Sequence, residues 1–361
     1  MPYYHGLKVY PPERADWIAR RLLALRRDLY RRITGPRRPG SLIIGSWNIR
    51  AFDWGLPRLD DSFHFIAEII AAFDICAIQE VKSDLGPLKR LIGLLGPNWD
   101  YFVTDISDHE GGNAERMAFV FNRNKVAFRN LVGEIVVRSD ALSSGLQIAR
   151  SPFFAAFQAG WFRFTLVSSH IVFGKTDAGG LAARAEEISA ISEAILKRAK
   201  TEDQVYIFLG DMNIDTRDGV VMQALRRSGL EVPAFPATNM GGDKFYDQIA
   251  YTVEGRSERK TRLLRFDAFD WRNAVYPYPD TRFETGGDPD YVQRPTFDDT
   301  VAYYEPVVAA HRDFNRKDAY ADFRKSYKRW NTEEMSDHLP IWVELETDYS
   351  DDYLMRFLAP S

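Results

Sequence analysis

Apolar residues recur along the chain at two different spacings, which together predict alternating strands and helices. Short segments rich in aromatic and β-branched residues predict strands, because such side chains suit a pleated and buried surface. Apolar residues spaced three and four apart predict helices. The predicted strands cover 42–48, 75–80, 117–123, 153–158, 162–169, 205–210, 245–252, 263–269 and about 339–345, and the predicted helices cover 62–73, 178–199 and 218–228. Many strands and few helices predict an α+β fold of two packed sheets with helices outside.

A further helix is predicted near the N-terminus. Its apolar stripe ends before Gly35 and consists of Ile18, Leu22, Leu25, Leu29 and Ile33. Around the stripe stand Arg20, Arg21, Arg26, Arg27, Arg31 and Arg32. We expect this helix to dock on the body with its arginines in solvent, although such a face could also contact phosphate or an anionic membrane.

One domain accounts for most of the chain, which at 361 residues is long enough to bury a large core. We expect residues 1–40 to form the basic helix and its linker. Residues 41–347 should form the domain, and residues 348–361 a C-terminal tail. The region 271–335 is rich in Tyr, Asp, Arg and Pro and has little periodicity before a predicted helix near 315–328. We interpret this region as an insertion.

Composition agrees with a folded protein, since 45% of residues are hydrophobic and 14% aromatic. The net charge of -4 neither supports nor excludes a nucleic-acid substrate. The single cysteine, Cys76, excludes an intramolecular disulfide framework and suits a reducing compartment. No apolar stretch reaches the roughly 18 residues needed to span a bilayer, and the first residues lack the order of a signal peptide. We therefore expect a soluble, cytoplasmic protein without a transmembrane segment.

Polar residues with related chemistry stand at the ends of predicted strands, within one of them in the case of Asp247, and just ahead of the last strand. They are Asn48, Glu80, His170, Asp211, Asn213, Asp247, Asp337 and His338. Carboxylate and amide oxygens suit a hard cation such as Mg²⁺, and the near absence of cysteine argues against zinc or an iron–sulfur centre. Two histidines that each pair with a carboxylate can divide acid and base duties. The set fits metal-assisted hydrolysis of a phosphate ester.

Seven motifs in sequence order resemble those of the endonuclease/exonuclease/phosphatase superfamily, most closely its DNase I-like branch. They are Ser46–Arg50, Ile78–Lys82, Glu115–Val120, Ser168–His170, Gly210–Asn213, Tyr246–Ile249 and Ser336–Pro340. The resemblance implies a four-layer α/β/β/α sandwich, in which two mainly antiparallel sheets are flanked by helices. It also implies an active site at one edge of the packed sheets.

The resemblance also implies roles for individual residues. Glu80 would be the principal Mg²⁺ ligand with Asn48 beside it, and Mn²⁺ or Ca²⁺ could replace Mg²⁺. His338 would be oriented by Asp247, and His170 by Glu115. The remaining residues would position water and phosphate or hold a second cation (Asp211, Asn213 and Asp337), contact phosphate (Arg150) or contact a nucleic-acid groove (Lys82).

The chain departs from the DNase branch just ahead of Glu115, where Asn113 and Ala114 replace an aromatic residue that stacks in the DNA minor groove. This departure counts against recognition of the minor groove of duplex DNA. His5, His64, His109 and His311 have no motif around them and are interpreted as ordinary histidines.

We expect a Mg²⁺-dependent phosphodiesterase, with DNA as the leading substrate and in-line attack by water. One alternative is a phosphatase or phospholipase-type enzyme acting on a small or lipid phosphoester. Another is a catalytically silent binding protein that uses the basic helix and the insertion as contacts.

Overall fold

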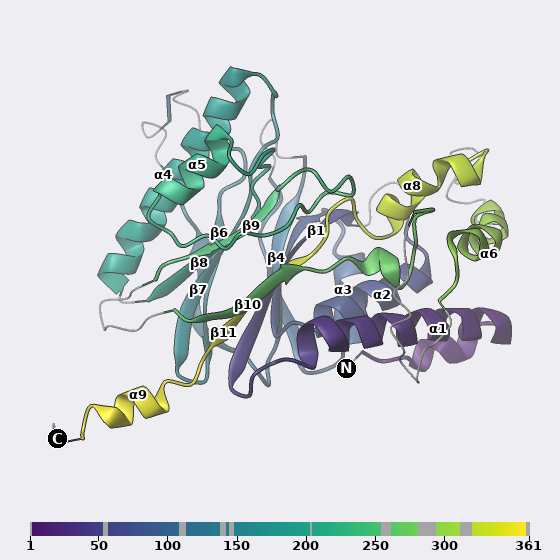
Figure 1. Ribbon diagram of the computed structural model, residues 1–361, viewed down its shortest axis with the longest axis horizontal. Helices are drawn as coiled ribbons and strands as arrows, with labels where there is room; N and C mark the ends of the chain where they lie inside the picture. The colour runs from purple at the N-terminus through teal and green to yellow at the C-terminus, as the bar shows by residue number, and fades with distance from the viewer. Residues whose placement is uncertain are drawn as a thin grey trace.

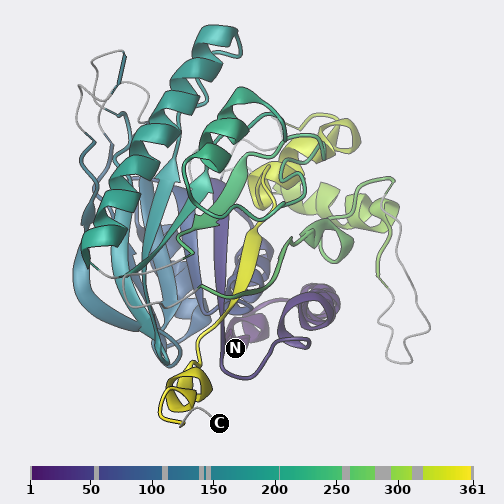
Figure 2. The same cartoon turned by 60° about the vertical axis from the view of Figure 1, so that its left-hand side comes forward.

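Two β-sheets pack face to face in the middle of the molecule, and helices cover both outer faces (Figures 1 and 2). The computed structural model describes residues 2–52, 57–107, 113–137, 142–143, 148–202, 204–253, 261–280, 294–310 and 320–358. The predicted fold class, a mainly antiparallel α/β/β/α sandwich, is confirmed.

The first sheet has six strands. Their order across the sheet is β10 (Leu263–Ala268), β11 (Ile341–Glu346), β1 (Ser41–Phe52), β2 (Ile75–Val81), β4 (Arg116–Asn122) and β3 (Trp99–Val103). Neighbouring strands are antiparallel except for β1 and β2, which are parallel.

The second sheet has five strands, and it too is antiparallel except for one parallel pair. Their order is β5 (Ala127–Glu134), β6 (Phe153–Ala159), β7 (Phe162–His170), β8 (Val205–Asp211) and β9 (Asp247–Tyr251). The parallel pair is β7 and β8. Each sheet therefore has one parallel pair in its interior.

Helices form the two outer layers (Figure 1). The first sheet is covered by α2 (Asp60–Ala71) and α3 (Gly86–Leu95), with α1 (Pro12–Leu29) packed on α2. The second sheet is covered by α4 (Ala178–Glu202) and α5 (Val220–Arg227). Further along the chain come α6 (Phe297–Ala310), α8 (Phe323–Glu334) and α9 (Ser350–Met355). A helix long and apolar enough to cross a membrane is not found in the described ranges.

The N-terminal helix α1 is docked on the body. Its apolar stripe is buried in the main core, and Arg26 pairs with Glu68 of α2 at 2.8 Å. Arg21 differs from the expected solvated arginine, since it is only 2% exposed. Its guanidinium lies 4.4 Å from the centroid of the Trp17 ring, and Trp17 donates a hydrogen bond to Tyr304 of α6. Arg21 is therefore covered by an aromatic ring of its own helix, and that ring is hydrogen-bonded to α6.

Several elements were not predicted: β3, β5, α3, α6 and α9. The edge strand β5 is mostly exposed and therefore lacks an apolar alternation. The region 271–335 contains α6 and α8, so it has more regular structure than its composition indicates. The helix expected near 315–328 is α8, which begins at Phe323, and residues 311–319, including His311, lie outside the described residues. His109 also lies outside them.

The close approach of β1 to the end of α2 gives a stability prediction. A Cβ atom added at Gly45 would overlap the ring of Phe73. We expect Gly45→Ala to lower the free energy of unfolding by about 1–3 kcal/mol in urea titrations, because the strand or the ring must move. Gly93→Ala in α3 is the control, since an added Cβ meets nothing within 4 Å and alanine favours a helix. Equal stability of Gly45→Ala and the wild type would contradict this packing constraint.

Candidate active site

The predicted site residues gather at one edge of the sandwich because of the strand directions. At this edge β1, β2, β7 and β8 end, whereas their antiparallel neighbours β4, β9 and β11 begin. His170 lies opposite Asp211 in the second sheet, and Asp211 lies opposite Asp247. In the first sheet, Ile341 at the start of β11 lies opposite Ser46 near the end of β1. Residues far apart in sequence are thereby brought together.

Strand alternation directs three of these side chains toward the first sheet. In β8, Ile207 and Leu209 belong to the core between the sheets, whereas Tyr206 and Phe208 pack under α4. Asp211 continues the inward series, because alternate residues of a strand share a face. By the same alternation, His170 continues the inward-facing residues that come before it in β7, and Asp247 precedes the inward-facing residues of β9.

The carboxylate of Asp211 is the point at which these residues meet. It is only 2% exposed. Its Oδ2 atom accepts a hydrogen bond from Asn48 Nδ2 at 3.0 Å, and it lies 3.5 Å from His170 Nε2 and 3.7 Å from His338 Nε2. Its Oδ1 atom accepts the backbone N–H of Asn213 at 2.9 Å. Both sheets thus contribute groups to one buried carboxylate.

His338 forms the more enclosed of two histidine–carboxylate pairs. Its Nδ1 atom lies 2.8 Å from Asp247 Oδ2, and the carboxylate is fully buried. Burial lowers the pKa of the His338 imidazole, but the negative charges of Asp247 and Asp211 more than offset this effect and raise it well above its ordinary value. Asp337 stands beside His338 in the same turn, half-buried, and adds further negative charge.

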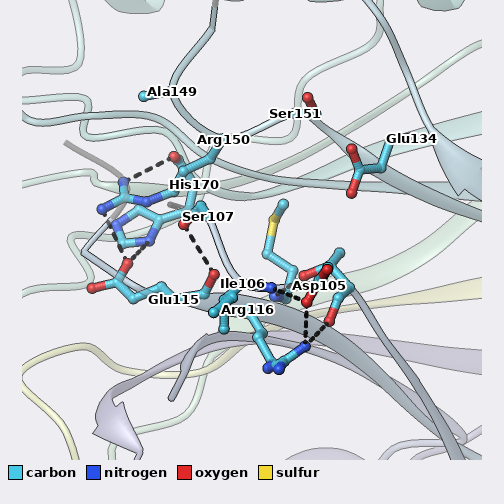
Figure 3. A pocket seen from close by; sticks show the side chains of 12 residues that line it. Asp105, Ile106, Ser107, Glu115, Arg116, Glu134, Ala149, Arg150, Ser151 and His170 are labelled. Atoms are coloured by element: carbon cyan, nitrogen blue, oxygen red, sulfur yellow. Dashed lines mark hydrogen bonds and ion pairs between the residues drawn. The ribbon is translucent and has the colours of Figure 1, made fainter. Parts of the chain in front are cut away.

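His170 forms the second pair, and its carboxylate is shared with two other cations. Glu115 Oε2 lies 3.1 Å from His170 Nδ1 and 3.0 Å from Arg150 Nη2, while Oε1 accepts a hydrogen bond from Lys82 Nζ at 2.9 Å. Arg150 also donates to the His170 carbonyl oxygen at 3.2 Å (Figure 3). The charged ends of Lys82 and Arg150 therefore both lie on Glu115, and their side chains are only 12% and 6% exposed.

Glu80 and Asn48 offer oxygen ligands for a hard cation. Asn48 Nδ2 donates to Glu80 Oε1 at 2.9 Å, and the backbone N–H of Ala51 donates to Oε2 at 2.7 Å. Glu80 and Ala51 have left-handed φ angles of 61° and 41°, next to a register shift between β1 and β2. Asn48 Oδ1 is buried and finds no hydrogen-bond partner among the described residues. A half-buried carboxylate beside an unpaired amide oxygen fits Mg²⁺ chemically.

A second group of potential ligands consists of Asp211, Asp247 and His338, whose ligand atoms lie within 4.8 Å of one another. In this group the Asp247 carboxylate is fully buried and already bonded to His338. Glu80, by contrast, is partly open to solvent. A cation can therefore reach Glu80 more readily than it can reach Asp247.

Two residues that hold the site together had no role assigned from sequence. Ser336 Oγ donates to the Asn48 carbonyl oxygen at 2.6 Å and accepts the backbone N–H of His338 at 3.0 Å, so it ties the His338 turn to β1. The buried Arg184 of α4 donates to the carbonyl oxygen of Asn213 at 2.7 Å. A sequence signal existed for Arg184, because it stands in helical phase with the buried isoleucines of α4, starting at Ile188.

Asn213 adopts a left-handed φ of 49°, which turns the chain sharply after β8. Its side-chain amide donates to the carbonyl oxygen of Ile171 at 2.7 Å, and its backbone N–H binds Asp211. In this structure Asn213 therefore braces Asp211 and the end of β7.

Known proteins share sequence features and the fold of this chain. The model of the Endonuclease/Exonuclease/phosphatase family matches residues 45–338. No curated protein matches the chain. A solved structure of a member of that family from Bacteroides thetaiotaomicron is 17% identical, with a TM-score of 0.53, over 87% of this chain and 100% of the other.

Two further solved structures are similar to this chain. The mannosyl-6-phosphatase of Bacteroides thetaiotaomicron VPI-5482 is 17% identical, with a TM-score of 0.52, over 84% of this chain and 99% of the other. TDP2 of D. rerio, complexed with single-strand DNA product, is 14% identical, with a TM-score of 0.52, over 85% and 99%. At these identities the likeness establishes the shared fold.

The cations around Glu115 give a prediction about stability in acid. Burial alone raises the pKa of Glu115, but His170, Arg150 and Lys82 lower it to about 2, from its ordinary value of 4.5. A depressed pKa stabilises the folded state above pH 4.5, and this contribution, up to about 3 kcal/mol, is lost as the pH falls toward 2. We expect Glu115→Gln to show a shallower loss of unfolding free energy than the wild type between pH 5 and pH 3 in urea titrations. If unfolding free energy falls equally steeply with pH in the variant and the wild type, the three cations do not offset the charge of Glu115.

Proposed function

Since the chain belongs to the endonuclease/exonuclease/phosphatase family, whose named activities all break phosphoester bonds, we propose that it is a divalent-metal-dependent phosphodiesterase. The observation that carries the proposal is the arrangement around Asp211. Two histidines each direct Nδ1 to a carboxylate of their own and Nε2 toward Asp211. Two proton carriers therefore face one small space.

In the proposed reaction, water attacks phosphorus in line with the leaving oxygen. Asp211 accepts a hydrogen bond from the attacking water and orients it, and Asn213 keeps Asp211 in place. One imidazole takes the proton from this water while the other protonates the departing alkoxide. Asp247 and Glu115 hold their histidines with Nε2 free for these transfers.

Glu80 and Asn48 would hold the cation, for which we propose Mg²⁺, with Mn²⁺ or Ca²⁺ as substitutes. When bound, a divalent cation offsets the negative charge that the phosphoryl oxygens develop. Lys82 and Arg150 fix Glu115, and through it they fix His170.

DNA is the first substrate class that we propose. A small or lipid phosphoester is the second candidate, because Asn113 and Ala114 place no aromatic ring ahead of Glu115 for groove stacking. Among the similar structures, the one from D. rerio carries a DNA product and one from Bacteroides is a sugar phosphatase, so this fold supports both substrate classes.

Substitution of the two histidines tests the reaction. We expect His170→Asn and His338→Asn each to lower Mg²⁺-dependent cleavage of single-stranded and plasmid DNA by about 10²–10⁴-fold, the usual contribution of a positioned acid or base. A chelator should abolish the wild-type activity.

The leaving group distinguishes the two histidines. On bis(p-nitrophenyl) phosphate the departing p-nitrophenolate needs little protonation, so the variant that lacks the acid should keep most of its activity and the variant that lacks the base should not. Full DNA cleavage by either variant would contradict the proposal. Turnover of no phosphoester, with or without metal, would instead support a binding protein.

A further inference from the structure

A cavity of about 330 Å³ opens beside His170 (Figure 3). Its walls come from Thr104–Ser107 after β3, Glu115 and the start of β4, the end of β5, residues 149–151 and His170 itself. The cavity therefore adjoins the histidine site, because His170, Glu115 and Arg150 belong to both.

The cations that line the cavity are already engaged by protein groups. Arg150 pairs with Glu115 at 3.0 Å. Arg116 donates to the carbonyl oxygen of Thr104 at 2.7 Å and lies 3.3 Å from Asp105. The Glu115 carboxylate offsets the charge of Arg150, and Asp105 offsets part of the charge of Arg116, so the two arginines attract an incoming anion less than unpaired cations would.

The carboxylates on the outer wall of the cavity are, by contrast, exposed to solvent. The Asp105 side chain is 89% exposed, and Arg116 is its weak partner at the cavity. Glu134, at the end of β5, is exposed, and no described residue forms a salt bridge or hydrogen bond with it. In Figure 3 its carboxylate points into the cavity from the side opposite His170.

This charge pattern disfavours a second phosphate and favours hydrogen-bond donors. A phosphate in the cavity would lie near two carboxylates of its own sign, whereas hydroxyl groups can donate to carboxylates. Apart from the His170 imidazole, which the proposed reaction uses, the lining residues, all of them described, include no aromatic ring on which a base could stack. The hydroxyls of Ser107 and Ser151 add polar groups.

We propose that the cavity is a subsite for an uncharged, hydroxyl-bearing group, a sugar or another polyol, joined to the phosphate that is cleaved. Glu134 and Asp105 accept hydrogen bonds from its hydroxyls. This assignment rests on the proposed phosphodiesterase function and narrows its substrates. A terminal nucleoside and a polyol head group both present this chemistry, but the continuing backbone of a polyanion does not pass over the cavity.

Charge reversal at Glu134 tests the subsite. The substrates are a dinucleoside monophosphate, glycerophosphoinositol, a long single-stranded oligonucleotide, and bis(p-nitrophenyl) phosphate, which has no polyol. We expect Glu134→Lys to raise KM about tenfold or more for whichever polyol-bearing diester the wild type cleaves, with kcat within about twofold, because a charged hydrogen bond is lost. Glu134→Gln should show a smaller increase. Kinetics on bis(p-nitrophenyl) phosphate should stay within about twofold.

The exposed Glu193 of α4 provides the control, since Glu193→Lys makes the same charge change away from the cavity. It should leave all four substrates unaffected. The subsite is overturned if Glu134→Lys lowers KM for the oligonucleotide, since that result means a polyanion crosses the cavity. It is also overturned if Glu134→Lys matches the control on every substrate. A wild type inactive on all four diesters overturns the proposed function itself, and the subsite with it.

Discussion

One buried negative charge, the Asp211 carboxylate, constrains the rest of the site. A buried charge is costly unless partners compensate it. The partners of Asp211 come from both sheets. Asn48 belongs to the first sheet, His170 lies beside Asp211 in the second, and His338 lies on the turn before β11. The face-to-face packing of the sheets and the compensation of this charge are therefore coupled, since a small shift of one sheet would separate Asp211 from Asn48. Residues such as Ser336 and Arg184, which touch neither histidine ring, maintain that alignment.

The two histidines stand in different electrostatic surroundings although each has a carboxylate. Asp247 is fully buried and its ion-pair partner is His338, whereas Glu115 divides its charge among His170, Arg150 and Lys82. Because Arg150 and Lys82 are occupied by Glu115, they are not free to attract anions toward the cavity beside His170, and the exposed carboxylate of Glu134 sets the character of that space.

Much of the fold and the site was predictable from sequence because it depends on local patterns. Central strands such as β8 are apolar on both faces, and polar residues placed directly after them must lie at a sheet edge. What could not be predicted depends on contacts between distant segments. The edge strand β5 has no buried face to create an alternation, and Arg21 is buried against Trp17, which is hydrogen-bonded to the distant helix α6. Likewise, Lys82 and Arg150 are simple basic residues in the sequence, and only the fold brings both onto Glu115.

The most direct test of the reaction is its stereochemistry at phosphorus. A phosphorothioate diester that is chiral at phosphorus, hydrolysed in oxygen-18 water, reports whether the nucleophile is water or a protein group. Direct attack by a water held at Asp211, with His170 and His338 only moving protons, inverts the configuration, and we expect inversion. Retention would mean two successive displacements through a covalent histidine or carboxylate intermediate, and it would contradict the roles assigned to Asp211 and both histidines.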